Sequence, residues 1–251
     1  SPVAALHVRA VISLRRSLVA MPTVLEARDL WKVYETGTNR VEALRKVSVV
    51  LSEGEMVAVM GPSGCGKTTL LNCLSGLDEI TSGEVLVNGQ ALSGMNDWDL
   101  THIRGERLGF IFQSFNLLPV LTAIENVELP LLMAGHSPKE ARQSALEALK
   151  AVGLEDRAGH LPAELSGGQQ QRVTIARSFV HSPAVILADE ATGNLDSKTQ
   201  TEILDLLQKL NRERGVTMVL VTHDAEVASR CTRVLVMRDG RIVEDNRNEE
   251  E

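Results

Sequence analysis

The chain has 251 residues, 43% of them apolar and 24% charged, and a formal net charge of −7. These values fit a soluble globular protein with one sizeable core, and the acidic balance argues against free nucleic acid as the main partner. Apolar runs fall short of the roughly 18 residues that a membrane span needs. The three cysteines lack the C-x-x-C spacing of zinc or redox sites, which favours a reducing, intracellular compartment.

Residues 1–21 differ from the rest of the chain, because they contain three arginines and no acidic residue. A transit peptide, a misassigned translation start and a cloning remnant share this composition. We expect a disordered extension without function, followed by one folded domain over residues 22–245 and an acidic tail over residues 246–251.

Residues 24–60 have the pattern of strands. Apolar side chains alternate up to the turn at Glu53 and Gly54, and residues 57–60 are apolar at every position, as in a strand buried on both faces of a parallel sheet. We then predict a glycine-rich loop, a helix over residues 67–74, a strand over 83–87, a partly helical stretch over 96–107 and a strand over 108–112.

The sequence changes character between about residues 114 and 170. Ser137 can cap a helix, Pro138 suits its first position, and Glu140 completes a capping box. Apolar residues then recur at helical spacing until Gly153 ends the pattern. We interpret this region as a helical subdomain inserted into the core.

The core resumes with a helix after Gly168. A strand over 184–188, a helix over 197–214 stopped by Gly215, a strand over 218–221 and a hairpin over 234–243 follow, the hairpin turning at Asp239 and Gly240. This alternation predicts an α/β fold whose mostly parallel sheet carries helices on both faces.

Eight consecutive residues match the pattern G-x-x-x-x-G-K-[ST]: Gly61, Pro62, Ser63, Gly64, Cys65, Gly66, Lys67 and Thr68. The pattern follows a buried strand and precedes a helix, so backbone N–H groups and the helix terminus can hold phosphate oxygens. In such loops the lysine reaches the β- and γ-phosphates and the Thr68 hydroxyl can ligate Mg²⁺. The alternative is a structural loop that ends in a surface lysine.

Asp189 and Glu190 end a buried strand, at the sheet edge where α/β proteins bind ligands. Asp189 can hold the Mg²⁺ hydration shell, and Glu190, one residue further out, can polarise an attacking water. The alternative is a pair of caps for the next helix.

The segment Ser166, Gly167, Gly168 and Gln169 enters a helix and offers a second anion-binding terminus. One nucleotide hardly needs two such cradles from one chain, whereas two chains packed head to tail could each complete the other's ATP site. Glycines cost a helix about 1 kcal/mol each relative to alanine, so we infer that something other than stability keeps them.

With these motifs, residues 24–244 resemble an ATP-binding-cassette (ABC) nucleotide-binding domain. The resemblance implies a P-loop NTPase (RecA-like) core with an antiparallel β subdomain and an inserted α-helical subdomain. It also implies an ATPase that binds ATP and Mg²⁺ and works as a head-to-tail homodimer.

The resemblance implies roles for further positions. Tyr34 resembles the aromatic residue that stacks on adenine, with a half-buried strand residue as the alternative, and Gln113 resembles the glutamine that contacts Mg²⁺ and water. Asp196 lies in the loop that crosses the dimer seam, His223 resembles the histidine at the γ-phosphate, and Thr69 extends the phosphate-binding set.

The implied catalytic residues are Lys67, Gln113, Glu190 and His223, and the implied metal ligands are Thr68, Gln113 and Asp189. Cys65 stands where serine is more usual. A thiol at a helix terminus could be oxidisable, whereas the other interpretation is packing by a small residue.

Residues 112–127 and 192–196 are similar to the lipoprotein-release, macrolide-efflux and cell-division ATPases. This resemblance implies a separate integral-membrane permease and a location at the cytoplasmic face of the inner or plasma membrane. A groove for the permease could be lined by five residues, which could equally belong to the subdomain core: Phe110, Phe112, Phe115, Leu117 and Leu118. The alternatives are a soluble ABC ATPase of DNA repair or translation and a scaffold subunit without chemistry.

Overall fold

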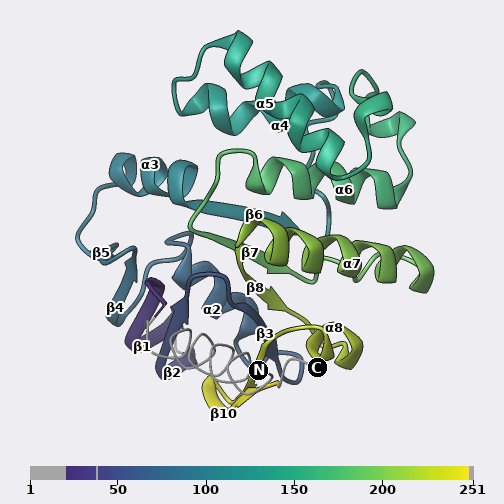
Figure 1. Ribbon diagram of the computed structural model, residues 1–251. Helices are drawn as coiled ribbons and strands as arrows, with labels where there is room; N and C mark the ends of the chain where they lie inside the picture. Colours follow the sequence, from purple (N-terminus) through teal and green to yellow (C-terminus); the bar gives the residue numbers. More distant parts are fainter. Residues whose placement is uncertain (1–20, 38, 249–251) are drawn as a thin grey trace, which may run out of the picture.

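The computed structural model describes residues 21–37 and 39–248 (Figure 1). The expected extension, apart from Met21, and the last three residues of the expected tail lie outside this range. The described part has an α/β core, a second small sheet beside it, and a group of helices at the other side of the core.

The central sheet has the strand order β10-β9-β3-β8-β7-β6. Its neighbours are parallel except for β10, which pairs antiparallel with β9. The strands are β3 (Met56–Met60), β6 (Leu108–Phe112), β7 (Val185–Asp189), β8 (Thr217–Val221), β9 (Arg233–Arg238) and β10 (Arg241–Arg247). The parallel arrangement places the carboxyl ends of β3 and β7 at one edge, so that the predicted phosphate loop and the pair Asp189 and Glu190 lie there.

The two faces of this sheet contribute to two separate cores. In β3, Met56 and Ala58 pack with the helices α4 to α7, whereas Val57 and Val59 pack with the helix α2 and the small sheet. Successive side chains of a strand point to opposite faces, so a strand covered on both sides needs apolar residues at every position. This explains the uninterrupted apolar runs of the central strands.

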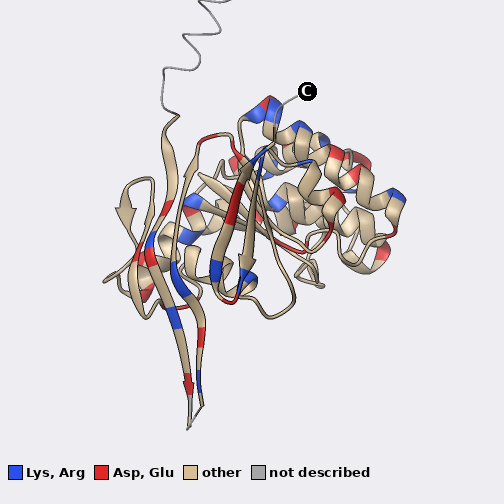
Figure 2. Ribbon diagram, turned by 90° about the horizontal axis from the view of Figure 1, so that it is seen from below, with Lys and Arg blue, Asp and Glu red and all other residues tan. Residues whose placement is uncertain are grey.

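The small sheet is antiparallel, with the order β2-β1-β4-β5. Its strands are β1 (Thr23–Thr36), β2 (Asn39–Ser52), β4 (Ser82–Val87) and β5 (Gln90–Ala91). The long β1–β2 hairpin projects from the body and carries charges of both signs (Figure 2). The helix α2 (Lys67–Leu74) contacts strands of both sheets and so lies between them.

The remaining helices follow the predicted order. They are α3 (Asp97–Arg107), α4 (Ala123–Met133), α5 (Pro138–Ala151), α6 (Gly167–Phe179), α7 (Ser197–Arg214) and α8 (Ala225–Ser229), with short 3-10 turns at Glu155–Arg157 and Pro162–Glu164. The predicted capping box of Ser137 and Glu140 begins α5, and Gly215 ends α7 in the left-handed conformation. The helices α4, α5 and α6 form one helical group, in which α6 packs against β6 and α4 and α5 lie farther from the sheet (Figure 1).

The expected tail needs a correction. β10 continues to Arg247, beyond the expected domain end at residue 245. The buried Arg233 guanidinium donates to both carboxylate oxygens of Asp245, at 2.7 Å each, and the Asn248 side chain donates to the Cys231 carbonyl. The charged residues up to Arg247 therefore belong to an edge strand and not to a tail. Their backbone pairs with β9, and Asp245 is bonded to Arg233 of that strand.

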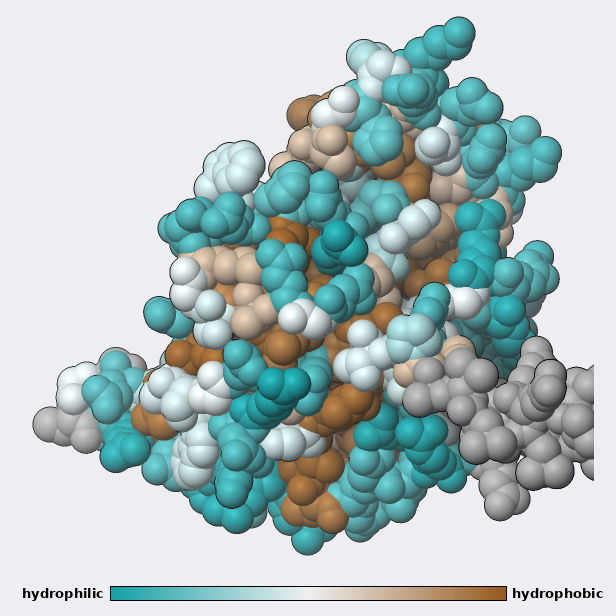
Figure 3. Space-filling view, turned by 60° about the vertical axis from the view of Figure 1, so that its left-hand side comes forward, coloured by the Kyte–Doolittle hydropathy of each residue, from teal (hydrophilic) through white to brown (hydrophobic). Residues whose placement is uncertain are grey.

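The outer surface is of mixed polarity. Figure 3 shows hydrophilic and hydrophobic residues interspersed over the side of the molecule that carries the small sheet. In the described part of the chain, no helix combines the length and apolar character required to cross a membrane.

Candidate nucleotide site

The phosphate loop, residues 61–68, connects β3 to α2 and depends on glycine at two positions. Gly66 has a φ of +103°, and a Cβ there would lie 2.5 Å from the Ala43 carbonyl oxygen of β2. A Cβ on Gly61 would collide with the Met237 carbonyl oxygen of β9. Only glycine fits such close backbone approaches at a positive φ, so β2 and β9 hold the loop in shape.

Lys67 is buried within this loop rather than exposed. Its side chain is 9% accessible, and Nζ donates to the carbonyl oxygens of Gly61 at 2.9 Å and Pro62 at 3.1 Å. The interpretation as a structural loop with a surface lysine is therefore wrong. The Lys67 ammonium group is therefore held by backbone carbonyl oxygens of the loop itself.

Asp189 lies at the end of β7, next to the phosphate loop. The Thr68 hydroxyl donates to Asp189 Oδ2 at 3.1 Å, so a hydroxyl and a carboxylate face each other across the two motifs. Burial raises the pKa of Asp189, and the charge of Glu190 raises it further, against the opposing effects of Thr68 and Lys67.

Glu190 turns away from the strand and contacts His223. Its φ of +46° lies in the left-handed region, a conformation that costs a residue other than glycine about 1 kcal/mol or more. Its Oε1 lies 3.0 Å from His223 Nδ1 at the end of β8. The following helix α7 is capped by Asp196, so Asp189 and Glu190 are not the caps that the alternative interpretation proposed.

The phosphate loop, Glu190 and His223 contribute to one open pocket of about 890 Å³, and Asp189 lies beside it in contact with Thr68. Ser63, Gly64, Gly66, Lys67, Thr68, Thr69, Glu190 and His223 were predicted for the site, and the structure brings them together there. Six further lining residues come from β2 and from the β9–β10 turn: Val41, Glu42, Ala43, Arg45, Asp239 and Gly240. No motif indicates these six, because they reach the pocket only through the pairing of β2 and β9 with distant elements.

A family profile described as ABC transporter matches residues 44–193. The chain belongs to the ABC transporter family. It is an ATP-binding subunit with ATPase activity, as the phosphate loop and the two carboxylates led us to expect. The match begins at residue 44, within the part of β2 that lines the pocket.

This ABC chain has close relatives over most of its length. An uncharacterized ABC transporter ATP-binding protein of Thermotoga maritima is 53% identical over 222 residues, which are 88% of this chain and 94% of the relative. The uncharacterized ABC transporter ATP-binding protein MJ0796 of Methanocaldococcus jannaschii is 48% identical over 223 residues, 87% of this chain and 95% of that protein.

A solved structure has the same fold. The dimeric post-hydrolysis state of the MJ0796 cassette bound to ADP and Pi matches with a TM-score of 0.82 at 45% identity, over 90% of this chain and 100% of that chain. The likeness confirms the predicted P-loop NTPase fold with its two subdomains.

In this ABC subunit the signature segment, residues 166–169, begins α6. The Ser166 hydroxyl accepts a hydrogen bond from the Gln169 N–H, and the Gln169 side chain accepts one from the Ser166 N–H. A Cβ on Gly168 would meet Thr199 of α7 at 2.5 Å, so close helix packing is one reason for this glycine. None of the four residues lines the pocket at the phosphate loop. Asp196 is likewise occupied as a helix cap, accepting from Thr199.

Gln113 lies directly after β6, close to Glu190. Its side chain donates to Asn194 Oδ1 at 3.3 Å, and Asn194 donates to the Gln113 carbonyl at 3.0 Å. A Cβ on Gly193 would lie 2.9 Å from Gln113 Nε2 and 3.3 Å from Glu190 Oε2. The structure thus brings Gln113 beside the predicted base.

Tyr34 does not line the pocket but lies next to a residue that does. It is 38% exposed, and it pairs across the strands with Val41, which lines the pocket. Burial and a hydrogen bond to Asp78 raise the pKa of the Tyr34 phenol, against the opposing effect of the neighbouring Thr69 hydroxyl. Directly paired residues share one face of a sheet, so Tyr34 faces the same side as the pocket wall.

Cys65 is 5% accessible and packs in the core under the small sheet. Its carbonyl accepts the N–H of Gly240 at 3.0 Å, which ties the phosphate loop to the β9–β10 turn. Burial of the thiol supports the packing interpretation over an oxidisable group, since oxidants need access to sulfur.

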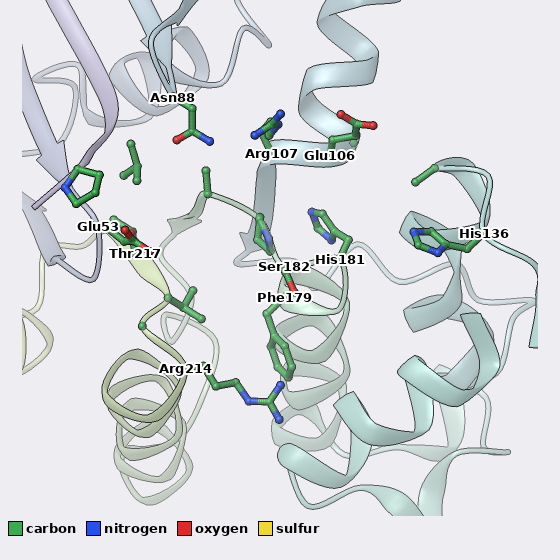
Figure 4. A pocket seen from close by; sticks show the side chains of 18 residues that line it. Glu53, Asn88, Glu106, Arg107, His136, Phe179, His181, Ser182, Arg214 and Thr217 are labelled. Carbon is green, nitrogen blue, oxygen red and sulfur yellow. The ribbon is translucent and has the colours of Figure 1, made fainter. Parts of the chain in front are cut away.

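A second hollow of about 680 Å³ lies at the opposite edge of the central sheet (Figure 4). It is lined by residues at the amino ends of β6, β7 and β8, among them Arg107 and Thr217, and Arg214 lies over the Phe179 ring at 5.1 Å. It contains none of the predicted site residues. Open α/β sheets bind their ligands at the carboxyl ends of the strands, so the nucleotide site is the pocket at the phosphate loop.

Proposed function

We propose that the chain binds ATP with Mg²⁺ at the phosphate loop and uses hydrolysis in a homodimer to drive a separate membrane permease. The observation that supports this most directly is the meeting of three features at one sheet edge. They are the buried Lys67 within its loop, Thr68 with Asp189, and Glu190 with His223.

The donor set fits Mg²⁺. Thr68 and Asp189 offer a hydroxyl and a carboxylate oxygen, and Gln113 can add an amide oxygen. Mg²⁺ usually keeps several water ligands and binds substrate phosphates, so it needs only one or two ligands from the protein. When bound, Mg²⁺ neutralises the charge that develops on the phosphates.

Glu190 is the general base in this proposal. Its carboxylate stands one residue beyond Asp189 and is partly exposed to the pocket, where it can accept a proton from an attacking water. His223 contacts the same carboxylate and can orient it, while the Lys67 ammonium stabilises the transferred phosphoryl group.

A second copy supplies the other half of each ATP site. The signature segment is absent from the pocket of its own chain, yet it presents a capped helix N-terminus suited to an anion. The relative MJ0796 forms a dimer with ADP and Pi. We propose the same head-to-tail pairing here, with Ser166, Gly167, Gly168, Gln169 and Asp196 at the seam.

The permease docks beside α4 in this proposal. Of the five groove candidates, Phe110, Phe112, Phe115 and Leu117 are partly buried, whereas Leu118 is 46% exposed. Val120 is 81% exposed in the same loop. The similarity to lipoprotein-release, macrolide-efflux and cell-division ATPases supports export or force transmission at the cytoplasmic face of the inner or plasma membrane.

Glu190→Gln tests the chemistry. The amide keeps the shape but cannot take a proton, so we expect ATP binding close to wild type and turnover lowered by about 100-fold or more. The trapped nucleotide should hold the chains together as a dimer in size-exclusion chromatography with ATP. Normal turnover of this variant would refute the assigned base, and Asp205→Asn on the outer face of α7 is a matched control.

A further inference from the structure

The Tyr34 phenol is held by a carboxylate from another element. Its hydroxyl donates to Asp78 Oδ2 at 2.5 Å, and Asp78 lies in the loop after α2. The other oxygen, Oδ1, accepts from Lys32 Nζ at 2.6 Å. Both carboxylate oxygens are therefore engaged, one by the hydroxyl of Tyr34 and one by the ammonium of Lys32 on the same strand.

Lys32 contacts the ring as well as the carboxylate. Its side chain is buried, and Nζ also donates to the Glu79 carbonyl at 2.7 Å. The same nitrogen lies 4.6 Å from the centroid of the Tyr34 ring, in cation–π range. Because the ammonium covers one face, the opposite face is the one that a base can stack on.

The loop that carries Asp78 is fixed to the helix of the phosphate loop. The N–H groups of Leu77 and Asp78 both donate to the Asn72 carbonyl, at 2.9 Å and 3.2 Å. Asn72 belongs to α2, which begins at Lys67. A continuous set of hydrogen bonds thus runs from the phosphate loop through α2 and Asp78 to the tyrosine ring.

The charges of this cluster are maintained at neutral pH. Burial raises the pKa of Asp78, but the hydrogen bonds from Lys32 and Tyr34 outweigh it and leave the pKa below its usual value. Burial lowers the pKa of Lys32, and Asp78 more than reverses this effect. Burial and the bond to Asp78 raise the pKa of Tyr34, so the phenol remains a donor.

We propose that Asp78 and Lys32 are positioning residues, which hold the Tyr34 ring at a fixed place relative to the phosphate loop so that it can stack on the adenine of bound ATP. This inference rests on the proposed role of Tyr34 in nucleotide binding. A ring fixed before binding loses less side-chain entropy on stacking than a freely rotating one. The carboxylate therefore contributes to affinity for the base without touching the nucleotide.

The test compares a ligand with a base to one without it. We expect Asp78→Asn and Tyr34→Phe each to raise the Kd for ADP about three- to tenfold, the effect of losing one typical hydrogen bond. The Kd for pyrophosphate, which has no base, should stay within twofold of wild type. Isothermal titration calorimetry measures both, and Asp205→Asn, the carboxylate of an exposed ion pair on α7, should change neither.

Coupling between the two side chains distinguishes positioning from two separate effects. The Kd for ADP of the double variant, Asp78→Asn with Tyr34→Phe, should not exceed the larger of the two single-variant values. The two substitutions remove the same hydrogen bond, so their effects should not add. Tyr34→Phe keeps the ring and leaves Lys32 paired with Asp78, so it provides the test even if Asp78→Asn folds poorly.

Tyr34→Ala separates the failure of this inference from the failure of the proposed function. An unchanged Kd for ADP in Tyr34→Ala would remove the stacking role itself, and the inference with it. If Tyr34→Ala weakens ADP binding while Tyr34→Phe and Asp78→Asn bind as wild type, stacking stands and positioning by Asp78 is overturned. Equal losses for ADP and pyrophosphate would also overturn it, since the residues would then act on the phosphate loop.

Discussion

Gly66 shows how one backbone position can fix a binding loop. Two effects exclude a side chain there, the positive φ of +103° and the Ala43 carbonyl oxygen 2.5 Å from a Cβ. The first is a local conformational cost, whereas the second couples the phosphate loop to β2. They can be separated experimentally, because Gly64 in the same loop has a φ of +77° and no atom within 4 Å of a Cβ.

We therefore predict that Gly66→Ala lowers the free energy of unfolding by about 3 kcal/mol and Gly64→Ala by only about 1 kcal/mol. The difference is the cost of moving β2 or the loop to relieve the collision. Urea denaturation of both variants without nucleotide measures it. Equal losses would mean that β2 yields freely and does not hold the loop.

At the residue scale, the motif residues could be found from sequence because their chemistry is local. The phosphate loop needs glycines, a lysine and a hydroxyl in one short stretch, and the structure brings them together as predicted. Arg45 and Asp239 could not be found this way. They reach the pocket through strand pairing between segments far apart in the chain, which a single sequence does not reveal.

At the element scale, caps and turns were predictable and ends were less so. Asp239 and Gly240 both have positive φ, as the Asp-Gly turn predicted. The end of β10 was missed because a run of charged residues has the composition of a solvated tail. Only the partners on other elements, Arg233 above all, show that residues 245–247 are paired.

The Arg233–Asp245 pair gives β10 a pH-dependent contribution to stability. The hydrogen bond from Arg233 is the main cause of the lowered pKa of Asp245. A carboxyl with a lowered pKa stabilises the fold above its unfolded pKa of about 4 and loses this effect as pH falls through its folded value. The contribution is therefore complete at neutral pH and disappears in acid.

We predict that Asp245→Asn lowers the free energy of unfolding at pH 7 by about 1 kcal/mol, a modest value because the Asp245 side chain is half exposed and solvent screens the pair. The difference from wild type should shrink below about pH 4. Urea denaturation of both proteins at about pH 7, 4 and 3 measures this difference in unfolding free energy. A constant difference over the series would show that the charge of Asp245 does not act through Arg233.

At the scale of the whole molecule, the phosphate loop and the signature segment, the second phosphate-binding element that we propose, do not meet. The phosphate loop leads into α2 between the two sheets, whereas the signature segment begins α6, which belongs to the helical group (Figure 1). Their separation within one chain gives the helical group a function in the proposed dimer. In that proposal α6 brings the signature segment to the partner's nucleotide, and the permease contacts Leu118 in the loop before α4.

Mixing two inactive variants tests this arrangement. Lys67→Ala disables the phosphate loop and leaves the signature segment intact, whereas Ser166→Arg does the reverse. In a mixed dimer, one site then combines two damaged halves and the other combines two intact halves. Random pairing makes half of the dimers mixed, so we expect ATPase activity up to about a quarter of wild type from two proteins that are each inactive alone.

The rescue should depend on protein concentration, because it requires association of two chains. The control mixes the single variant Lys67→Ala with the double variant that carries both Lys67→Ala and Ser166→Arg. No dimer in this mixture contains an intact phosphate loop. ATP turnover is measured against total protein, and pairing is followed by size-exclusion chromatography with ATP. Mixed dimers that form but remain inactive would contradict a site shared between chains, whereas activity in the control would contradict the role of Lys67.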